Sequence, residues 1–372
     1  MKFSVQREAL LKSLSLVAGV VERRQTLPIL ANILFDIEGD NLALTGTDLE
    51  VEITARLKLE SPAPDSLRIT LPARKLLDIS KSLPEGSSVN FSTTDGQKVQ
   101  LSSGRSRFTL STLPASDFPN VEESDARAEL RISQGQLKRL IDRTAFAMAQ
   151  QDVRYYLNGM LWELGQNRLR VVATDGHRLA MCDLESDSIQ ASAGDLVQII
   201  VPRKGILELS RSLHSEEEEV RLVIGKNHLR AATGDFTFVT KLVDGKFPDY
   251  QRVLPRGGDK IVIGPRLGLK EAFQRASILS NEKYRGVKLA LSNELLTIRA
   301  NNPEQEEAED AVAVDYRGES IEIGFNVNYL IDVASVLSGE TIKLTLADSN
   351  CSVLMEESSE SDSLYVIMPM RL

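Results

Sequence analysis

The feature that most constrains this chain is an internal repeat with a constant stride of 127 residues. Thr47-Asp48 recurs as Thr174-Asp175, and Asn301-Asn302 follows at the same interval. Three further positions fall in the same register, namely Phe35, Trp162 and Leu289. Because a repeat of this length is the size of a domain, the 372 residues predict one small fold used three times. The predicted domains are residues 1–124, 129–250 and 251–372, with linkers expected near 120–129 and 254–260.

Each copy is expected to contain two helices among many short strands. In the second helix, apolar or small residues recur at i, i+3, i+4 and i+7, starting from Leu76, Ile206 and Leu330. The first helices are expected at residues 10–21, 137–148 and 269–279. Alternating apolar runs flank turn residues such as Gly39-Asp40-Asn41, which predicts hairpins. The predicted fold class is therefore α+β, with two helices packed on mostly antiparallel sheet in each domain.

The distribution of charge along the chain is uneven. A net charge of −9 seen alone argues against a nucleic-acid partner, because binding to phosphates rests on basic residues. The charged residues of the six expected helices nevertheless sum to about +8, which leaves about −17 on the rest. One interpretation is that these residues are only the solvated faces of amphipathic helices. The other is that the helices line a basic wall that follows a polyanion without reading its sequence.

Composition excludes several other classes of protein. Hydrophobic residues make up 42% of the chain and charged residues 26%, which is ordinary for a globular protein. No apolar run approaches the roughly 20 residues that span a membrane, and no signal-peptide pattern opens the sequence, so a cytoplasmic location without membrane contact is expected. The two cysteines, Cys182 and Cys351, are too few for a disulfide framework or a metal site, and both are interpreted as buried small hydrophobes. No cofactor is predicted.

An enzyme is the main alternative from another functional class. Asp175, His177 and Arg178 together would offer an acid, a base and an anion binder. However, Asp48 recurs at the equivalent place without a histidine, so both aspartates are predicted to stabilise a shared turn. Neither a glycine-rich phosphate loop nor metal-ligand spacing accompanies the three histidines. A non-catalytic protein is therefore expected.

Long motifs link the chain to a known family over its whole length. They are Thr26-Leu27-Pro28-Ile29-Leu30, Leu44-Thr45-Gly46-Thr47-Asp48-Leu49-Glu50, Gln151-Asp152-Val153-Arg154-Tyr155-Tyr156-Leu157-Asn158-Gly159, Ala173-Thr174-Asp175-Gly176-His177-Arg178-Leu179, Asn301-Asn302-Pro303-Glu304-Gln305-Glu306-Glu307 and the terminal Met368-Pro369-Met370-Arg371-Leu372. With them the chain resembles the β subunits of bacterial DNA polymerase III, the sliding clamps. The resemblance implies a head-to-tail homodimer, a ring of six domains that encircles duplex DNA and gives the polymerase processivity. A protein-interaction scaffold that never touches DNA remains the alternative function.

The resemblance also implies a pocket between the second and third domains that receives short linear motifs. Its partners would be the catalytic subunit of DNA polymerase III, the clamp loader, translesion polymerases, ligase and mismatch-repair proteins. The matching positions are Leu157, Thr174, Gly176, His177, Arg178, Leu179, Pro248, Arg252, Val253, Asn326, Tyr329, Val366, Ile367, Met368, Pro369, Met370 and Arg371. Methionines suit such a pocket because they adapt to varied apolar side chains, although ordinary core packing is the alternative for Met368 and Met370.

Two more sets of positions follow from the same resemblance. The implied DNA contacts are Arg24, Gln151, Tyr155, Tyr156, Arg203 and Lys204. The implied dimer interface comprises Phe108 and Leu110 facing Ile278 and Leu279 of the next chain, with Arg105 and Arg107 facing Glu304, Glu306, Glu307 and Glu309. The chain departs from the basic pattern in the second helix of the third copy, where Asn328 and Ser335 stand, so weak DNA contact is expected there. Residues 185–195 are expected to form a surface loop without an assigned function.

Overall fold

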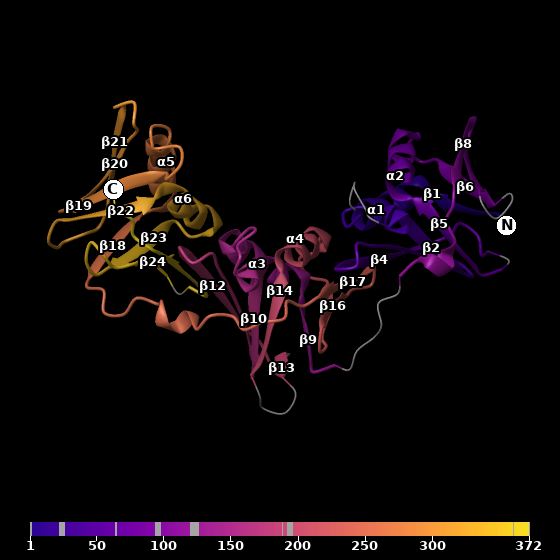
Figure 1. The fold of residues 1–372 in the computed structure, drawn as a ribbon, viewed down its shortest axis with the longest axis horizontal. Helices are drawn as coiled ribbons and strands as arrows, with labels where there is room; N and C mark the ends of the chain where they lie inside the picture. Colours follow the sequence, from indigo (N-terminus) through magenta and orange to yellow (C-terminus); the bar gives the residue numbers. More distant parts are fainter. Residues whose placement is uncertain are drawn as a thin grey trace. The chain divides into compact units, whose positions relative to one another are not determined.

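The computed structural model describes residues 2–21, 27–63, 65–93, 98–119, 126–187, 189–191, 196–359 and 361–371. In these residues the chain forms helices of 10 to 12 residues and short strands (Figure 1). Every strand pair whose register is resolved is antiparallel, as in β2 with β3 and β10 with β11. The α+β class predicted from the sequence is therefore confirmed.

The first copy of the repeat holds two helices and eight strands among its described residues. They are β1 (Lys2–Gln6), α1 (Arg7–Val17), β2 (Asn32–Glu38), β3 (Asn41–Thr47), β4 (Val51–Lys58), β5 (Leu67–Pro72), α2 (Ala73–Ser82), β6 (Ser88–Thr93), β7 (Lys98–Ser103) and β8 (Ser106–Ser111). Helix α1 begins directly after β1, three residues before the predicted start, and it ends at Val17 where residue 21 was predicted. The first helices of the other two copies also begin and end earlier than predicted.

The second copy repeats this order with one added short strand. Its elements are β9 (Ala128–Ser133), α3 (Gln134–Thr144), β10 (Gly159–Gly165), β11 (Arg168–Thr174), β12 (Arg178–Glu185), β13 (Ile189–Ala191), β14 (Val197–Pro202), α4 (Arg203–Ser212), β15 (Glu219–Ile224), β16 (His228–Ala232) and β17 (Phe236–Lys241). The loop expected at residues 185–195 thus includes the strand β13, and residues 188 and 192–195 lie outside the described residues.

The third copy returns to the order of the first. Its elements are β18 (Lys260–Pro265), α5 (Arg266–Ser277), β19 (Gly286–Ser292), β20 (Leu295–Asn301), β21 (Glu307–Ala313), β22 (Ile321–Asn326), α6 (Val327–Val336), β23 (Thr341–Leu346), β24 (Val353–Glu357) and β25 (Ser363–Ile367). The hairpins β2–β3, β10–β11 and β19–β20 begin at residues 32, 159 and 286, so the stride of 127 is a property of the backbone as well as of the sequence.

The strands form four sheets that lie within two compact units. Unit 1 contains the described residues of 1–135, 190–195 and 204–242, and unit 2 contains those of 136–189, 196–203 and 243–372. Unit 1 has the sheets β1-β6-β7-β8 and β13-β9-β15-β16-β17-β4-β3-β2-β5. Unit 2 has the sheets β14-β10-β11-β12-β25-β24-β23-β18 and β21-β20-β19-β22. Each unit contains a sheet that combines strands from two copies of the repeat, so the units do not correspond to single copies. The three domain boundaries drawn from the sequence therefore stay a prediction.

Two strand pairings join successive copies of the repeat. In the first junction β4 of copy one pairs with β17 of copy two, and Val51 lies opposite Thr240. In the second junction β12 of copy two pairs with β25 of copy three, and Arg178 lies opposite Ile367. The two pairings have the same register once both strands are shifted by 127 residues. The two junctions therefore share the same strand pairing and register.

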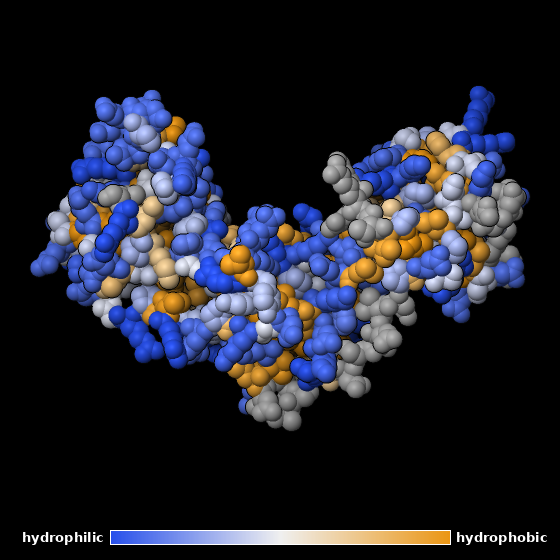
Figure 2. Space-filling model, in the orientation of Figure 1, coloured by the Kyte–Doolittle hydropathy of each residue, from blue (hydrophilic) through white to orange (hydrophobic). Residues whose placement is uncertain are grey.

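Large apolar side chains are concentrated in the interior. Trp162, Phe35 and Phe238 are fully buried, and the aromatic rings of Phe3 and Phe91 stack at 4.8 Å between centroids. Figure 2 shows mostly hydrophilic residues on the visible face, with apolar residues in limited patches. Among the described residues, no helix has both the length and the apolar composition needed to cross a membrane.

Candidate functional site

A cavity of about 180 Å³ opens in unit 2 near one end of the second junction. It is lined by Arg154, Leu157, Thr174, Gly176, Arg178, Leu179, Pro248, Asp249, Tyr250, Val253, Val366 and Met368. Its apolar wall continues into a buried cluster that includes Leu161, Val172 and Ile200. A small, mostly apolar cavity with a few fixed polar groups can hold apolar side chains of a peptide.

A tight turn after β11 forms one rim of this cavity. Thr174 Oγ1 donates to the Arg178 carbonyl at 2.6 Å, and Asp175 Oδ1 accepts from the N–H groups of His177 and Arg178 at 2.9 and 3.0 Å. Gly176 has φ +88°, a conformation that suits glycine, and a Cβ there would lie 3.1 Å from the Arg154 guanidinium. Asp175 is therefore committed to the turn, as the sequence predicted.

The same turn exists in the first copy with different side chains. Asp48 Oδ1 accepts from the N–H groups of Glu50 and Val51 at 2.9 and 2.7 Å. Leu49 occupies the place of Gly176 and has φ 78°. The shared Asp therefore serves the backbone in both copies, which removes the basis of the acid-base interpretation of Asp175.

Arg178 ties the cavity to the helices beside it. Its guanidinium donates to Asp175 at 3.1 Å, to the Phe146 carbonyl at 2.8 Å and to the Asp332 carboxylate. It also lies 4.4 Å from the centroid of the Tyr329 ring, in a cation–π contact. With its donors fixed by these partners, Arg178 holds α6 against β12 and shapes the wall of the cavity.

Tyr250 is a buried polar element of the cavity that the sequence analysis did not identify. Its hydroxyl donates to Glu163 and accepts from Arg170 at 3.3 Å, and Arg170 is paired with Asp183. Burial raises the pKa of the Tyr250 hydroxyl. The sequence Phe247-Pro248 repeats Phe118-Pro119 of the first copy and marks the segment that carries Tyr250, so it was the available signal.

A rigid loop at residues 151–158 forms the adjoining wall. The side chain of Asn158 donates to the Asp152 carbonyl and accepts from the Asp152 N–H, both at 2.9 Å. Hydrogen bonds from the Arg154 side chain and N–H lower the pKa of Asp152 to about 2. Arg154 Nη2 also donates to the Asp175 carbonyl at 3.3 Å, which links this loop to the turn. The loop therefore presents Arg154 to the cavity, a position that the sequence analysis missed, as it missed Asp249.

The segment after β25 supplies an exposed apolar side chain. Val366 and Ile367 are buried, whereas 39% of Met368 is exposed at the cavity. The Met368 N–H donates to the His177 carbonyl at 2.9 Å, and the Met370 N–H donates to the Gly324 carbonyl at 2.8 Å. The flexible Met368 side chain is thus held by its backbone at the mouth of the cavity.

The cavity gathers about half of the pocket positions implied by the resemblance. Those that line it are Leu157, Thr174, Gly176, Arg178, Leu179, Pro248, Val253, Val366 and Met368. Those that lie outside the lining are His177, Arg252, Asn326, Tyr329, Ile367, Pro369, Met370 and Arg371. Of the latter, Tyr329 packs under Arg178, Asn326 caps α6, and Arg252 forms an exposed pair with Asp249 at 2.8 Å. Their contacts support the cavity or flank it.

The positions implied for DNA contact have varied surroundings. Arg24 lies outside the described residues. Gln151 and Tyr155 are exposed, and the Tyr155 ring meets the Tyr156 ring edge-on at 5.7 Å. Arg203 Nη1 donates to the Met148 carbonyl at 3.2 Å. Lys204 forms an ion pair with the buried Asp48 carboxylate, so part of its charge is already balanced.

Arg143, which belongs to the helix charge count, is not on the surface. Arg143 is only 7% exposed and is paired with Asp362 and Glu357. Its charge is balanced within unit 2, so it does not contribute to a basic helix face. Cys182 is buried as predicted, and burial raises the pKa of its thiol to about 11, whereas Cys351 is only half-buried. The interpretation of Cys351 as a buried hydrophobe is therefore wrong.

Both sets of implied interface residues lie at or beside sheet edges. β8, which carries Arg107, Phe108 and Leu110, is the last strand of its sheet, and β21 is the first strand of another. Ile278, just after α5, is 75% exposed, and Leu279 is half-buried. Arg105 is exposed beside β8, and Glu304, Glu306 and Glu307 are exposed at the start of β21. Edge strands carry unpaired backbone N–H and C=O groups that can pair with another chain.

Comparison with known proteins gives consistent matches over the whole chain. Models of the N-terminal, central and C-terminal domains of the DNA polymerase III beta subunit match residues 1–122, 131–249 and 251–371. The beta sliding clamp of Pseudomonas aeruginosa is 61% identical over 372 residues, covering 100% of both chains. Crystal structures of a DNA polymerase sliding clamp from this organism with ligand, and of its sliding clamp bound to griselimycin, both have a TM-score of 0.96, at 60% and 61% identity, and cover 100% of both chains.

Proposed function

Because the chain belongs to the DNA polymerase III beta subunit family, with its three-domain clamp fold, we propose that it acts as a sliding clamp. It is a non-catalytic ring that encircles duplex DNA, tethers the replicative polymerase and confers processivity. The observation that carries the ring is the strand-pairing rule of the two junctions. The alternative, a scaffold that never touches DNA, has no comparable structural support.

The pairing rule leaves one strand at each end of the repeat with one edge unpaired in the described residues. β4 of copy one pairs with the last strand of copy two, and β12 of copy two pairs with the last strand of copy three. The corresponding strand of copy three is β21, and the last strand of copy one is β8, and both are sheet edges. A third pairing of the same kind joins β21 to β8 of a second chain. The resulting contact is heterologous and closes a head-to-tail dimer.

Carrying over the register predicts which residues meet at this contact. With the strand equivalence taken from these pairings, Arg107 is predicted to lie opposite Glu309, and Phe108 opposite Ala308, of the next chain. An Arg and a Glu directly opposite on antiparallel strands attract one another. Ile278 supplies exposed apolar surface near the same edge, and Leu279 beside it is half-buried.

Cysteine cross-linking tests the register. Arg107→Cys combined with Glu309→Cys should yield a covalently closed dimer under mild oxidation, because directly opposite residues have Cβ atoms about 4.5–5.5 Å apart. Arg107→Cys with Glu307→Cys is the control displaced by two residues, and each single variant controls for Cys182 and Cys351. Equal cross-linking of the displaced pair, or none in either, would refute the proposed register.

The ring itself is tested on circular DNA. The protein is loaded onto a nicked circle with the clamp loader and ATP, the salt is raised, and the circle is then linearised. Topological linkage predicts retention on the circle and loss from the linear form, whereas ordinary phosphate contacts weaken with salt on both. Loss from both forms at the same salt concentration would favour the scaffold alternative. Because a sliding clamp acts on chromosomal DNA, we propose that the protein works in the cytoplasm, at the nucleoid.

The cavity at the second junction is proposed as the binding site for short linear motifs of the partners. The candidates are the polymerase catalytic subunit, the clamp loader, translesion polymerases, ligase and mismatch-repair proteins. Its apolar lining with Met368 at the mouth suits one site that accepts several apolar motifs. Deleting residues 368–372 should abolish peptide binding while leaving the dimer intact, as measured by anisotropy and sedimentation. A monomeric product would mean that the segment serves the interface instead.

For the implied DNA contacts, we propose that Gln151, Tyr155, Tyr156 and Arg203 face the duplex together with Arg24. Lys204 is the weakest member of this set because of its pair with Asp48. A charge-removing change at Arg24 should therefore lower the salt dependence of DNA binding more than the same change at Lys204. Binding isotherms at several salt concentrations give both slopes.

A further inference from the structure

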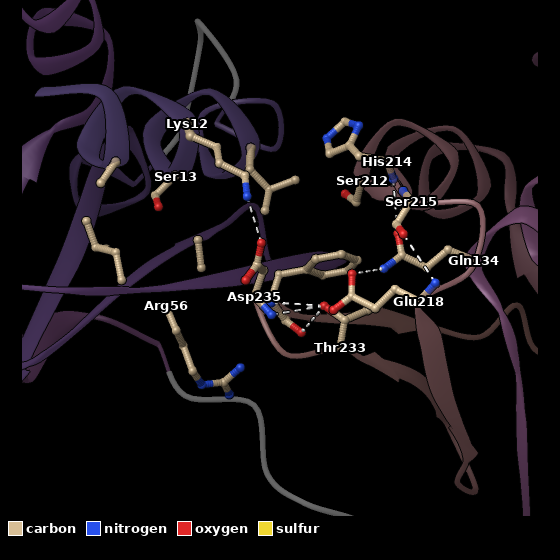
Figure 3. A pocket seen from close by; sticks show the side chains of 15 residues that line it. Lys12, Ser13, Arg56, Gln134, Ser212, His214, Ser215, Glu218, Thr233 and Asp235 are labelled. Atoms are coloured by element: carbon tan, nitrogen blue, oxygen red, sulfur yellow. Dashed lines mark hydrogen bonds and ion pairs between the residues drawn. The ribbon is translucent and has the colours of Figure 1, made fainter.

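A second cavity, of about 380 Å³, opens in unit 1 beside α1 at the first junction, and we call it the α1 cavity. Figure 3 shows Lys12 reaching Asp235 on one side of it and Gln134 beside Glu218 on the other. Lys12 Nζ donates to Asp235 Oδ2 at 2.7 Å, and Gln134 Nε2 donates to Glu218 Oε2 at 2.8 Å. Two carboxylates therefore line a space that can hold a side-chain-sized ligand.

The second junction contains a region equivalent to the α1 cavity, formed by residues 127 positions later in the chain. The Arg56 N–H donates to the Asp235 carbonyl at 2.8 Å, and the Asp183 N–H donates to the Asp362 carbonyl at 2.8 Å. The strand registers of the two junctions also agree. Asp235 and Asp362 thus occupy the same position in the two junctions, and their surroundings can be compared residue by residue.

At the second junction a guanidinium fills this place. The Arg143 guanidinium has four side-chain partners, which are Asp362 Oδ1 at 2.8 Å, Ser363 Oγ at 2.7 Å, Ser338 Oγ at 2.9 Å and Glu357 Oε1 at 3.3 Å. The residue 127 positions before Arg143 is Leu16, which lines the α1 cavity. An apolar side chain therefore stands in the first junction where a bonded cation stands in the second.

A second guanidinium of the repeat is replaced at the same cavity. Arg7 and Arg266 are the first residues of α1 and α5, and their Nε groups donate to the carbonyls of Ser80 at 3.0 Å and Gly339 at 2.7 Å. The first residue of α3 is Gln134, an uncharged side chain that lines the α1 cavity. The α1 cavity is thus lined by two neutral residues, Leu16 and Gln134, at positions that carry guanidinium groups elsewhere in the repeat.

The carboxylate acceptor, in contrast, is retained. Asp235 Oδ2 accepts from Lys12, just as Asp362 Oδ2 pairs with Arg139 at 2.6 Å. Asp362 Oδ1 accepts from Arg143, but leucine at position 16 offers no donor to the corresponding oxygen of Asp235. The cation Arg56 donates Nη2 to Thr237 at 2.8 Å, and its guanidinium points away from Asp235 in Figure 3. A planar fork of N–H donors is the group that matches such an acceptor.

We propose that the α1 cavity binds an alkylguanidinium group, with Asp235 as the main acceptor and Glu218 as a second carboxylate on the opposite wall. The group is supplied by a small molecule or by an arginine side chain of a partner peptide. Its position corresponds to that of the Arg143 guanidinium in the second junction. The site is separate from the peptide cavity of unit 2, and it does not depend on ring closure.

The test uses the full-length protein with methyl-labelled leucine, titrated with ethylguanidinium chloride at constant ionic strength. Saturable shifts of the methyl signals of Leu16 and Leu57, which both line the α1 cavity, are expected. Ethylammonium should cause much weaker shifts. Asp235→Asn should weaken binding about tenfold or more, because a charged acceptor is lost. Glu50→Gln, an exposed carboxylate outside the cavity, is the matched control. Leu16→Arg should abolish binding by supplying the guanidinium from the chain itself.

The outcomes are distinguishable. Absence of saturation, equal response to ethylammonium, or undiminished binding by both Asp235→Asn and Leu16→Arg would overturn the proposal. If a capped arginine amide binds at least about tenfold more tightly than ethylguanidinium, the site reads an arginine within a peptide, and equal affinities indicate a free small molecule. Both results support the site and identify its source of ligand. Amide spectra of the variants confirm that each is folded.

Discussion

The first and second junctions share one strand register, but different side chains fill the space around them. The second junction buries Arg143 among four partners and opens an apolar cavity at its other end. The first junction has Leu16 in place of Arg143. The repeat thus conserves the backbone, which is set by ladder hydrogen bonds, while side chains assign each junction a different use.

The same comparison explains why the peptide cavity has its place in the second junction. The Met368 N–H donates to the His177 carbonyl at 2.9 Å, and the Lys241 N–H donates to the Glu50 carbonyl at 2.9 Å, so Lys241 is the counterpart of Met368. Leu49 likewise takes the place of Gly176. A lysine and a leucine therefore stand in the first junction where the second has an adaptable methionine and a glycine without a side chain.

The largest expected effect comes from making the second junction resemble the first. Arg143→Leu leaves Asp362 and Glu357 partly buried without their shared cation, which typically costs about 3–5 kcal/mol of unfolding free energy. Native-state hydrogen exchange should show faster opening of β25. The matched control is Arg139→Leu, an exposed member of the same helix with a pair to Asp362. If both variants open β25 equally, the buried pair is not what stabilises this junction.

The second largest effect is expected in the pH dependence of stability, which should differ between the two junctions. Burial raises the pKa of Glu52, on β4, from 4.5 to about 7, with Arg230 opposing the shift, and the counterpart of Glu52 is the uncharged Leu179. Between these pH values the folded state binds a proton that the unfolded chain does not, so stability rises as the pH falls from about 7 to about 4.5. At pH 8, Glu52→Gln should stabilise unit 1 by on the order of 2–3 kcal/mol.

Exchange of β4 amides at pH 5 and pH 8 measures this effect. Glu50→Gln, at an exposed neighbouring position, should leave the dependence in place. Retention of the full dependence in Glu52→Gln would assign it to another group.

Single substitutions can give the peptide cavity the residues that stand at the same positions in the first junction. Gly176→Leu and Met368→Lys introduce the residues found at positions 49 and 241. Each should lower the affinity for a clamp-binding peptide about tenfold, or about 1.4 kcal/mol. The leucine would occupy space at the rim beside Arg154, and the lysine would replace the apolar methionine at the mouth with a charged side chain. Fluorescence anisotropy measures this, with sedimentation as the check on dimerisation. Unchanged affinity in both variants would place the motif elsewhere.

The smallest effect is expected for the exposed ion pair of the first junction. Lys12 and Asp235 are both largely exposed, so a double-mutant cycle on them should give a coupling of about 0.2–1 kcal/mol. The cycle on Arg139 and Asp362 should give a larger value, because Asp362 also binds Arg143. Equal couplings would show that Arg143 does not organise the second junction.

Local features of the fold were predicted well from the sequence. The hairpin turn at Gly39-Asp40-Asn41 and the Asp48 and Asp175 turns are found as expected, because turn chemistry depends on neighbouring residues. The starts of the first helices were missed by three residues, since apolar periodicity does not register polar first-turn residues such as Arg7 and Gln134. These residues begin their helices directly after a strand.

The candidate site was predictable only in part. The resemblance supplied Leu157, Arg178 and Met368, which line the cavity. Tyr250 was missed because its partners Glu163 and Arg170 are 87 and 80 positions away in sequence. Lys204 was predicted to contact DNA, but the prediction did not include its ion pair with Asp48, which forms through tertiary packing.

The sequence by itself determined the threefold repeat, the hairpins and turns, and the family, because these rest on local pattern and on long motifs. Only the tertiary structure decided which charges are balanced, which junction opens a peptide cavity, and where the α1 cavity lies. The physical reason is that burial and ion pairing depend on residues brought together by strand pairing between copies. Arg143 and Asp362, 219 positions apart, meet only through that pairing.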